Sequence, residues 1–222
     1  QEVTITNSTI ERSGGAGVEI RSGLANPTTT GYGQEIFIRN SIIQDNAGSG
    51  VDVELNARGA QEITVDASQI LRNGGDGIRS VNRVSGLQEF PILEGRGAGI
   101  SNNVITGNAE QAIDIEVNDN ARIAVLNVVN NDLQNNSGAS DLDVRATALG
   151  TSACVVLQNN TVPTGIELHT FAFDVNNRAT FLVQNRDALS VNNNGAPVQL
   201  INDRTNTLDT LAFSNEANFC VP

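Results

Sequence analysis

The pattern of apolar and polar positions repeats along the first two thirds of the chain. Each unit runs from an apolar residue through two variable residues, a serine or asparagine and one variable residue to a second apolar residue. The six units occupy residues 5–10 (ITNSTI), 38–43 (IRNSII), 65–70 (VDASQI), 100–105 (ISNNVI), 128–133 (VVNNDL) and 157–162 (LQNNTV). Short cores at a variable spacing of 27 to 35 residues are typical of solenoids.

A second short strand is predicted after each of the first five units. The turn between the unit and this strand is rich in glycine in most cases. Its apolar positions are Val18 and Ile20, Val51 and Val53, Ile78, Ile113 and Ile115, and Leu142 and Val144. Alternation of apolar and polar residues indicates strands, and no segment keeps a helical period. A single unit cannot bury its own apolar face, so successive units must stack at the strand spacing of about 4.8 Å. We therefore predict an all-β fold, a right-handed parallel β-helix of five to six coils; an antiparallel β-sandwich is the alternative.

Serine and asparagine recur at two corners of each predicted coil. The first corner holds Ser8, Ser41, Ser68, Asn103, Asn131 and Asn160, and the second holds Ser13, Asn46, Asn73, Asn108 and Asn136. Because an amide both donates and accepts hydrogen bonds, stacked asparagines can form continuous ladders. We expect Asn103 and Asn131 to be buried in one such ladder, which explains why the chain holds 29 asparagines.

Residues 163–222 depart from the repeat and contain five of the seven phenylalanines, with short strands plausible at 166–173, 180–184 and 197–201. The open end of a β-helix exposes strand edges that invite aggregation. We therefore predict two units, β-helix coils over 1–162 and a C-terminal β cap over 163–222. Insertions of variable length follow each second strand, and the longest are 21–34 and 82–97. Phe90, Pro91, Ile92 and Leu93 lie in the latter and are candidates to cover that side of the coils.

The two cysteines lie at the last predicted coil and at the chain end. A disulfide between Cys154 and Cys220 would tie the tail to the coils, and it implies an oxidising compartment, so we expect a secreted or cell-surface protein. Two reduced, unrelated cysteines are the alternative. The chain starts at Gln1, inside the repeat, and we expect it to be part of a longer protein with further coils upstream.

The net charge of −12 excludes nucleic acid as a partner and disfavours anionic membrane surfaces, and all 13 basic residues are arginine. A nucleic-acid-binding protein needs a basic surface, which this composition does not provide. No apolar run approaches the roughly 18 residues needed to cross a bilayer, so we predict no membrane insertion.

Two stretches, NSTIERSGGAGVEI (7–20) and SQILRNGGDGIRS (68–80), resemble the pectin-lyase-like superfamily of right-handed β-helices over residues 1–162. The asparagine-rich coils with a predicted cysteine-closed cap also look like large secreted bacterial surface proteins. That superfamily holds lyases, hydrolases, epimerases, adhesins and phage tailspikes, so the resemblance implies a fold more than a function.

The resemblance supplies tests for catalysis. Polygalacturonases of this superfamily hold paired aspartates and a Gly-His-Gly in the turn before the second strand, since hydrolysis needs two carboxylates at one bond. Here Asp76 stands where their histidine would, and the turns hold no adjacent pair of carboxylates. His169, the single histidine, falls in the predicted cap, and we expect it away from the coils. A calcium-dependent lyase built from aspartate and arginine stays open.

Charged residues occupy the outward positions of the second strands. One column reads Glu19, Asp52, Arg79, Asp114 and Asp143, and the next reads Arg21, Glu54, Val81, Glu116 and Arg145. Stacked carboxylates repel one another and need arginine or a cation between them, which Arg79 would supply in the third coil. The candidate ligand-binding residues are Glu19, Asp52, Glu54, Asp76, Arg79, Asp114, Glu116 and Asp143. They suit a neutral sugar or a calcium-assisted site, and the alternative is a solvated face that keeps the solenoid soluble.

The function predicted first is a non-catalytic secreted or cell-surface module, structural or adhesive, with a glycan or other envelope proteins as partners. We predict no cofactor, although calcium is the cation that the acidic face could take. Two alternatives stay open: a polysaccharide lyase or glycoside hydrolase acting on a cell-wall or extracellular glycan, and a fragment of an oligomeric spike.

Overall fold

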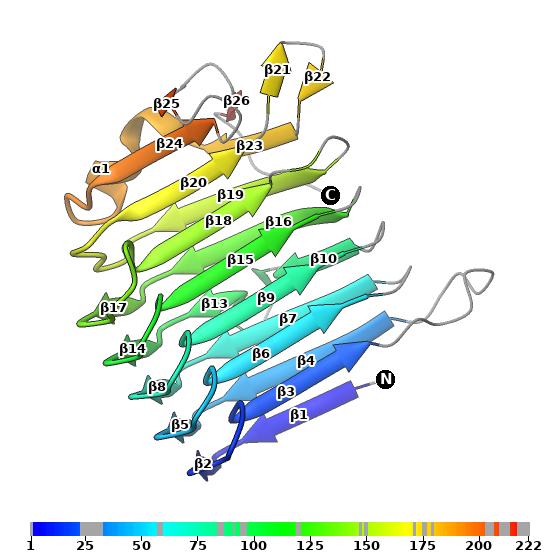
Figure 1. The fold of residues 1–222 in the computed structure, drawn as a ribbon, viewed down its shortest axis with the longest axis vertical. Helices are drawn as coiled ribbons and strands as arrows, with labels where there is room; N and C mark the ends of the chain where they lie inside the picture. The colour runs from blue at the N-terminus through cyan, green and yellow to red at the C-terminus, as the bar shows by residue number, and fades with distance from the viewer. Residues whose placement is uncertain are drawn as a thin grey trace.

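The predicted parallel β-helix is confirmed. The computed structural model describes residues 2–22, 33–56, 60–83, 87–90, 92–93, 97–118, 121–146, 148, 151–170, 172–174, 177–178, 180–202, 207–208 and 214–216. Their coils stack along the long axis of the molecule, so that equivalent strands form three continuous sheets (Figure 1). Five successive coils contribute a strand to all three sheets.

The first sheet contains the longest strands of the molecule, and its strands pair in parallel. It comprises β1 (Glu2–Thr6), β4 (Gly33–Arg39), β7 (Ala60–Asp66), β10 (Leu87–Phe90), β13 (Ile100–Ser101), β16 (Arg122–Val129), β19 (Ser152–Gln158), β23 (Thr180–Gln184) and β26 (Ser214–Glu216). The second sheet comprises the three-residue strands β2 (Thr9–Glu11), β5 (Ile42–Gln44), β8 (Gln69–Leu71), β14 (Val104–Thr106) and β17 (Asp132–Gln134).

The third sheet carries the charged columns predicted above. Its parallel strands are β3 (Val18–Ser22), β6 (Val51–Leu55), β9 (Ile78–Asn82), β15 (Ile113–Val117), β18 (Leu142–Ala146), β20 (Ile166–Thr170) and β24 (Val198–Asn202). The short strand β25 (Thr207–Leu208) closes the sheet in antiparallel orientation. Two antiparallel hairpins lie outside the three sheets: β11 (Ile92–Leu93) with β12 (Gly97–Ala98), and β21 (Ala172–Asp174) with β22 (Asn177–Arg178).

Aliphatic side chains of equivalent positions stack inside the coils. In the first sheet, Ile5 lies opposite Ile38, which lies opposite Val65, and the column continues through Ile100, Val128 and Leu157. In the second sheet, the column contains Ile10, Ile43, Ile70, Ile105 and Leu133. Most of these side chains are fully buried, so removal of their apolar surface from water is the main force that holds the coils together.

Both corners of each coil turn through a left-handed backbone. Immediately before the first ladder position, residues with positive φ are Asn7, Asn40, Ala67, Asn102, Asn130 and Asn159; before the second they are Arg12, Asp45, Arg72, Gly107 and Asn135. Asparagine and glycine adopt this conformation at the lowest cost, which accounts for their excess at the corners.

The predicted ladders are present, and Asn103 and Asn131 are buried as expected. In each middle step, the side-chain oxygen of one coil accepts hydrogen bonds from the backbone N–H and the side-chain amide of the preceding coil. Asn131 Oδ1, for example, accepts from the N–H of Asn103 at 3.0 Å and from its Nδ2 at 2.9 Å. The second ladder repeats this arrangement through Asn46, Asn73, Asn108 and Asn136.

The parallel pairing continues past residue 162. The strand β20 pairs in register with β18, β24 pairs with β20, and β23 pairs with β19. Here the second sheet is replaced by a bridge at Thr161 and by the short helix α1 (Leu189–Asn192), which follows the 3₁₀ turn Arg186–Ala188. Asn193, just after α1, takes the next place in the first ladder by accepting from Asn160 Nδ2 at 2.7 Å. The division of the chain at residue 162 stays a prediction.

The predicted insertion over 82–97 is corrected in part. Its segment Leu87–Phe90 forms β10, which pairs in parallel with both β7 and β16 and so belongs to the first sheet. The residues Leu87–Phe90 do not alternate in polarity, and the register with β16 shifts between Gln88 and Glu89, so the sequence pattern did not indicate this strand. The structure does not describe Pro91 or the side chains of Phe90, Ile92 and Leu93, so their predicted role in covering the coils stays a prediction.

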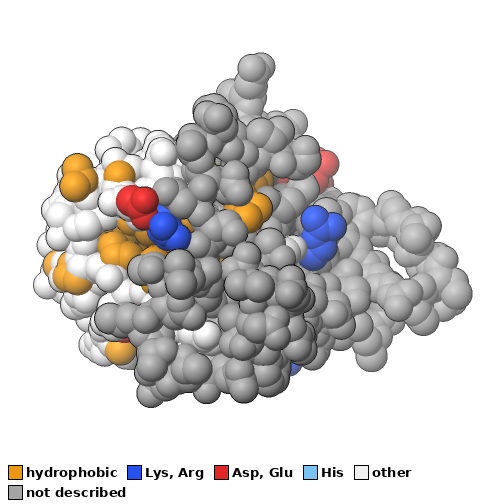
Figure 2. Space-filling view, turned by 90° about the horizontal axis from the view of Figure 1, so that it is seen from above, with side chains coloured by type: hydrophobic (Ala, Val, Ile, Leu, Met, Phe, Trp, Pro, Cys, Tyr) orange, Lys and Arg blue, Asp and Glu red, His pale blue; other side chains and the backbone are white. Residues whose placement is uncertain are grey.

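Several predictions about the C-terminal region fall outside the described residues. Cys154 is buried in β19, but Cys220 is not described, so the disulfide stays a prediction. Phe181 is fully buried, whereas Phe171, Phe213 and Phe219 are not described. Seen from the C-terminal end, the described surface shows hydrophobic side chains in several places and only a few charged ones (Figure 2). No helix among the described residues is long and apolar enough to cross a membrane.

Candidate functional site

The outward side chains of the third sheet form two columns, as the sequence predicted. Register pairs place Glu19 beside Asp52, Asp52 beside Arg79, Arg79 beside Asp114, and Asp114 beside Asp143. The second column runs through Arg21, Glu54, Val81, Glu116 and Arg145. We call these two columns the charged face.

Arginines join carboxylates of the same or adjacent coils on the charged face. Arg79 Nη1 lies 3.0 Å from Asp52 Oδ1, so Arg79 has the bridging role predicted for it. Arg145 Nη2 lies 2.6 Å from Asp114 Oδ1, and its Nε lies 3.6 Å from Asp143 Oδ2.

Two more exposed arginines, Arg21 and Arg83, lie beside carboxylates of the first two coils. Arg21 Nε lies 2.5 Å from Glu19 and 3.8 Å from Glu54, and Arg83 Nη1 lies 3.2 Å from Glu54 Oε1. Glu116 is held differently, by a hydrogen bond of 2.7 Å from Asn118 Nδ2. Each carboxylate of the charged face therefore has an arginine or an amide beside it.

Asp76 lies apart from these columns, in the turn before β9, and only 2% of its surface is exposed. Its Oδ1 accepts a hydrogen bond of 3.1 Å from the backbone N–H of Gln111. Burial raises the pKa of Asp76 to about 7, and the negative charges of Asp114 and Glu110 act in the same direction. Asp76 is thus a buried carboxyl group that can hold a proton near neutral pH.

The expectation that His169 lies away from the coils is wrong. His169 is on β20, where it pairs in register with Arg145, and its Nε2 lies 3.7 Å from Asp143 Oδ1 and 3.5 Å from Glu167 Oε2. Both columns of the charged face thus extend by one coil. Burial raises the pKa of Asp143 to about 6, even though the neighbouring positive charges of Arg145 and His169 lower it.

Sequence reasoning missed Glu167 and His169 as site residues, although a signal was present. The segments IDIE, LDVR and IELH begin at Ile113, Leu142 and Ile166, and each alternates an apolar residue with a polar one. The third falls in the segment predicted as a cap, because residues 163–222 depart from the repeat of the first coils and are rich in phenylalanine. Parallel pairing of β20 with β18 shows that it is the next rung of the same sheet.

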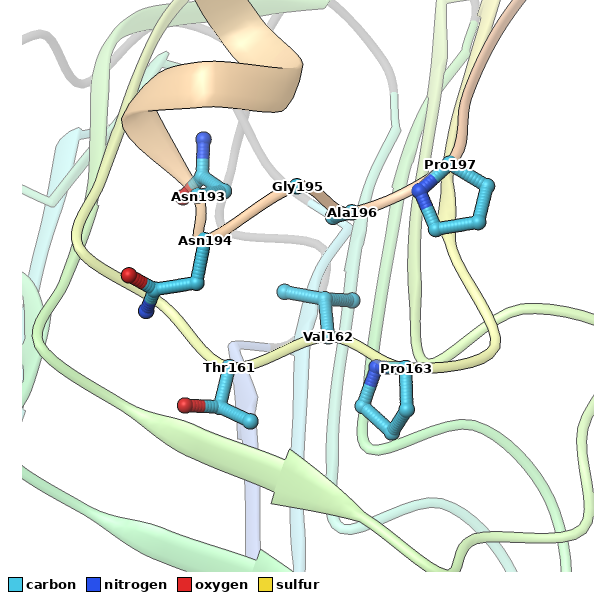
Figure 3. Close-up of a pocket in the computed structure, with 8 residues that line it drawn as sticks. All are labelled: Thr161, Val162, Pro163, Asn193, Asn194, Gly195, Ala196 and Pro197. Carbon is cyan, nitrogen blue, oxygen red and sulfur yellow. The ribbon is translucent and has the colours of Figure 1, made fainter.

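A separate pocket of about 200 Å³ lies where two turns meet near the C-terminal end (Figure 3). Its lining comes from Thr161, Val162 and Pro163 on one turn and from residues 193–197 on the other. None of these side chains carries a charge, and Asn193 and Asn194 already donate hydrogen bonds to neighbouring backbone carbonyls. The pocket therefore offers no acid, base or metal ligand.

Comparison with protein families matches residues 1–162 to a family described as the right handed beta helix region. Comparison with curated proteins and with solved structures found no match.

Proposed function

We propose that this chain, which belongs to the right-handed beta helix family, is a non-catalytic secreted or cell-surface module with a structural or adhesive role. Its charged face is the surface that we expect to meet a glycan or another envelope protein. Stacked coils suit a stalk or support, because three continuous sheets with two buried ladders resist bending at every coil.

The observation that carries this proposal is the pairing of charges on the charged face. A hydrolase needs two carboxylates that face one glycosidic bond, and a lyase needs carboxylates free to hold calcium. Here Asp52 and Asp114 are each held by an arginine, at 3.0 and 2.6 Å. A face whose carboxylates are already engaged by arginine or amide groups suits hydrogen bonding to the hydroxyl groups of a neutral sugar better than attack on it.

The test is incubation of the whole chain with pectate, alginate and neutral glycans, with and without calcium. Unsaturated products are followed by absorbance and new reducing ends by a colour reaction, and glycan binding is measured in parallel. We expect no turnover of any substrate. Calcium-dependent product formation that disappears in Asp52→Ala or Asp114→Ala, but not in the control Glu11→Ala on β2, would contradict the proposal.

One observation favours the enzymatic alternative, a polysaccharide lyase or glycoside hydrolase. Asp76 has a pKa of about 7, which suits a group that gives and takes a proton near neutral pH. However, its 2% exposure leaves no surface for a substrate to reach. If turnover were found, loss of it in Asp76→Asn would identify this carboxyl group as the acid or base.

A further inference from the structure

The C-terminal end of the charged face brings together three side chains that differ from the arginine-paired groups before them. Asp143 on β18 pairs in register with Glu167 on β20, and His169 lies two residues further along β20 on the same face. The nitrogen His169 Nε2 lies beside both Asp143 Oδ1 and Glu167 Oε2. Among the described residues, this is the one group of three whose potential metal-ligand atoms all lie within 4.8 Å of one another.

The distances between these atoms fit a metal ion better than they fit direct hydrogen bonds. His169 Nε2 lies 3.7 Å from Asp143 Oδ1 and 3.5 Å from Glu167 Oε2, both too long for a hydrogen bond. Two ligand atoms that each lie about 2.1 Å from a tetrahedral zinc ion are about 3.4 Å apart. The observed spacing is therefore close to that of a zinc site.

Asp143 provides an independent indication that something is bound. Its side chain is only 6% exposed. No described residue donates a hydrogen bond to its buried Oδ1, and a buried, unsatisfied carboxylate oxygen is costly. A cation at this oxygen would remove that cost, and the oxygen faces His169.

The surrounding groups already orient the three side chains. Arg145 lies beside Asp143 Oδ2 and is engaged with Asp114, which leaves Oδ1 for the side of His169. Gln199 Nε2 on β24 lies 3.4 Å from Glu167 Oε1, which leaves Oε2 toward His169. Such outer contacts fix ligand orientation at metal sites.

We propose that Asp143, Glu167 and His169 bind a divalent first-row transition metal, with zinc as the probe of choice. An imidazole nitrogen with two carboxylate oxygens suits zinc and its neighbours, whereas calcium prefers oxygen ligands alone. Three protein ligands leave the fourth position of the metal for water or for a group of a partner, on the side where Glu167 and His169 are 18% and 17% exposed. The site does not depend on whether the module is catalytic.

The experiment titrates zinc into the whole chain after removal of metals with a chelator, using a chromophoric competitor to measure affinity. We expect one equivalent to bind, and calcium in the millimolar range not to displace it. Cobalt in place of zinc should give the visible absorption of a low-symmetry site. His169→Ala should lose the site, and Glu167→Gln should weaken binding by at least about tenfold.

The matched control is Asp52→Asn, which removes a carboxylate of the same column three coils away and should bind zinc as the unaltered chain does. Zinc should raise the thermal midpoint of the unaltered chain but not of His169→Ala, whose midpoint in chelator shows whether it is folded. Failure of the unaltered chain to bind zinc would overturn the proposal, and so would unchanged binding by folded His169→Ala.

Discussion

The corners of the coils and the charged face repeat with the same period but follow opposite rules. At the first corner, every coil from Ser8 to Asn193 places a serine or an asparagine at the same point. On the charged face, the equivalent positions change from glutamate to aspartate to arginine and back to aspartate. The corner keeps the same residue types from coil to coil, whereas the charged face keeps only the same register.

Burial explains the difference. At the corner, each ladder oxygen from the second coil on accepts from a backbone N–H of the preceding coil, and most of the ladder side chains are buried. A residue without a suitable oxygen would leave several buried groups unpaired. On the charged face, most side chains are partly exposed, although Val81, Asp114 and Asp143 are buried, and a charge needs only some opposite charge nearby. Variation is therefore tolerated where ligands can reach the molecule, and excluded where they cannot.

The largest effect is expected from breaking the first ladder at its middle. Asn131→Leu removes the acceptor of two hydrogen bonds from Asn103 and the donor to the carbonyl of Ile100. Each buried group left unpaired costs about 1–3 kcal/mol, so we expect the free energy of unfolding to fall by at least about 3 kcal/mol.

The matched control for this change is Gln69→Leu, which replaces an exposed amide on β8, beside the partly exposed Val104. It should leave the free energy of unfolding nearly unchanged. Denaturant unfolding of both variants makes the comparison, and equal stability of Asn131→Leu and the unaltered chain would show that the ladder does not stabilise the coils.

An intermediate effect that depends on pH is expected at Asp76, in the turn before β9. The unfolded chain releases the proton of Asp76 near pH 4, whereas the folded chain keeps it up to about pH 7. The folded state binds more protons across this range, so its stability falls as the pH rises from about 4 to about 7. Asp76→Asn removes this loss of stability, because asparagine does not ionise. The side-chain oxygen of asparagine can still accept the hydrogen bond from the backbone N–H of Gln111.

We expect Asp76→Asn to raise the thermal midpoint by several degrees at pH 8 and to have almost no effect at pH 4. Asp45→Asn provides a control of opposite sign, because the hydrogen bond from Arg72 lowers the pKa of that exposed carboxyl group. Thermal unfolding across this pH range measures both variants. A gain at pH 4 as large as that at pH 8 would contradict the assignment.

The smallest effect is expected on the charged face itself. Arg79→Gln removes the partner of Asp52, in a pair whose side chains are 31% and 16% exposed. Partly solvated ion pairs contribute less than about 1 kcal/mol, and salt weakens them further. A double-mutant cycle with Asp52→Asn measures the coupling, and a coupling as large as the loss in Asn131→Leu would remove the distinction between face and corner.

The interior of this fold could be predicted almost completely from the sequence, because burial imposes a repeated residue type. The spacing of Ile5, Ser8 and Ile10 recurs in six successive units, so the aliphatic columns and the ladder positions of these units followed directly. The same reasoning predicted the register of Glu19, Asp52 and Arg79, because outward positions are fixed once the inward ones are known.

Two features could not be predicted in this way. At the end of the solenoid, α1 replaces a strand of the second sheet, yet Asn193 still completes the first ladder. A sequence motif based on the spacing of strand residues could not identify Asn193 as a ladder residue. The cluster of Asp143, Glu167 and His169 was missed because it depends on pairing of β18 with β20 across a shortened connection. Which residues of the charged face contact a ligand depends on the identity of that ligand, so the predicted binding residues stay predictions.

The most direct test of the central claim, that buried asparagine ladders stabilise the corners of stacked coils in addition to the aliphatic core, is hydrogen exchange of side-chain amides followed by nuclear magnetic resonance. The account predicts that the amide protons of Asn73, Asn108 and Asn131 exchange as slowly as backbone amides of the core strands, because each is buried and donates to the next coil or to a carbonyl. Those of the exposed Asn40 should exchange at the rate of a free amide. Equally fast exchange at all four asparagines would contradict the claim.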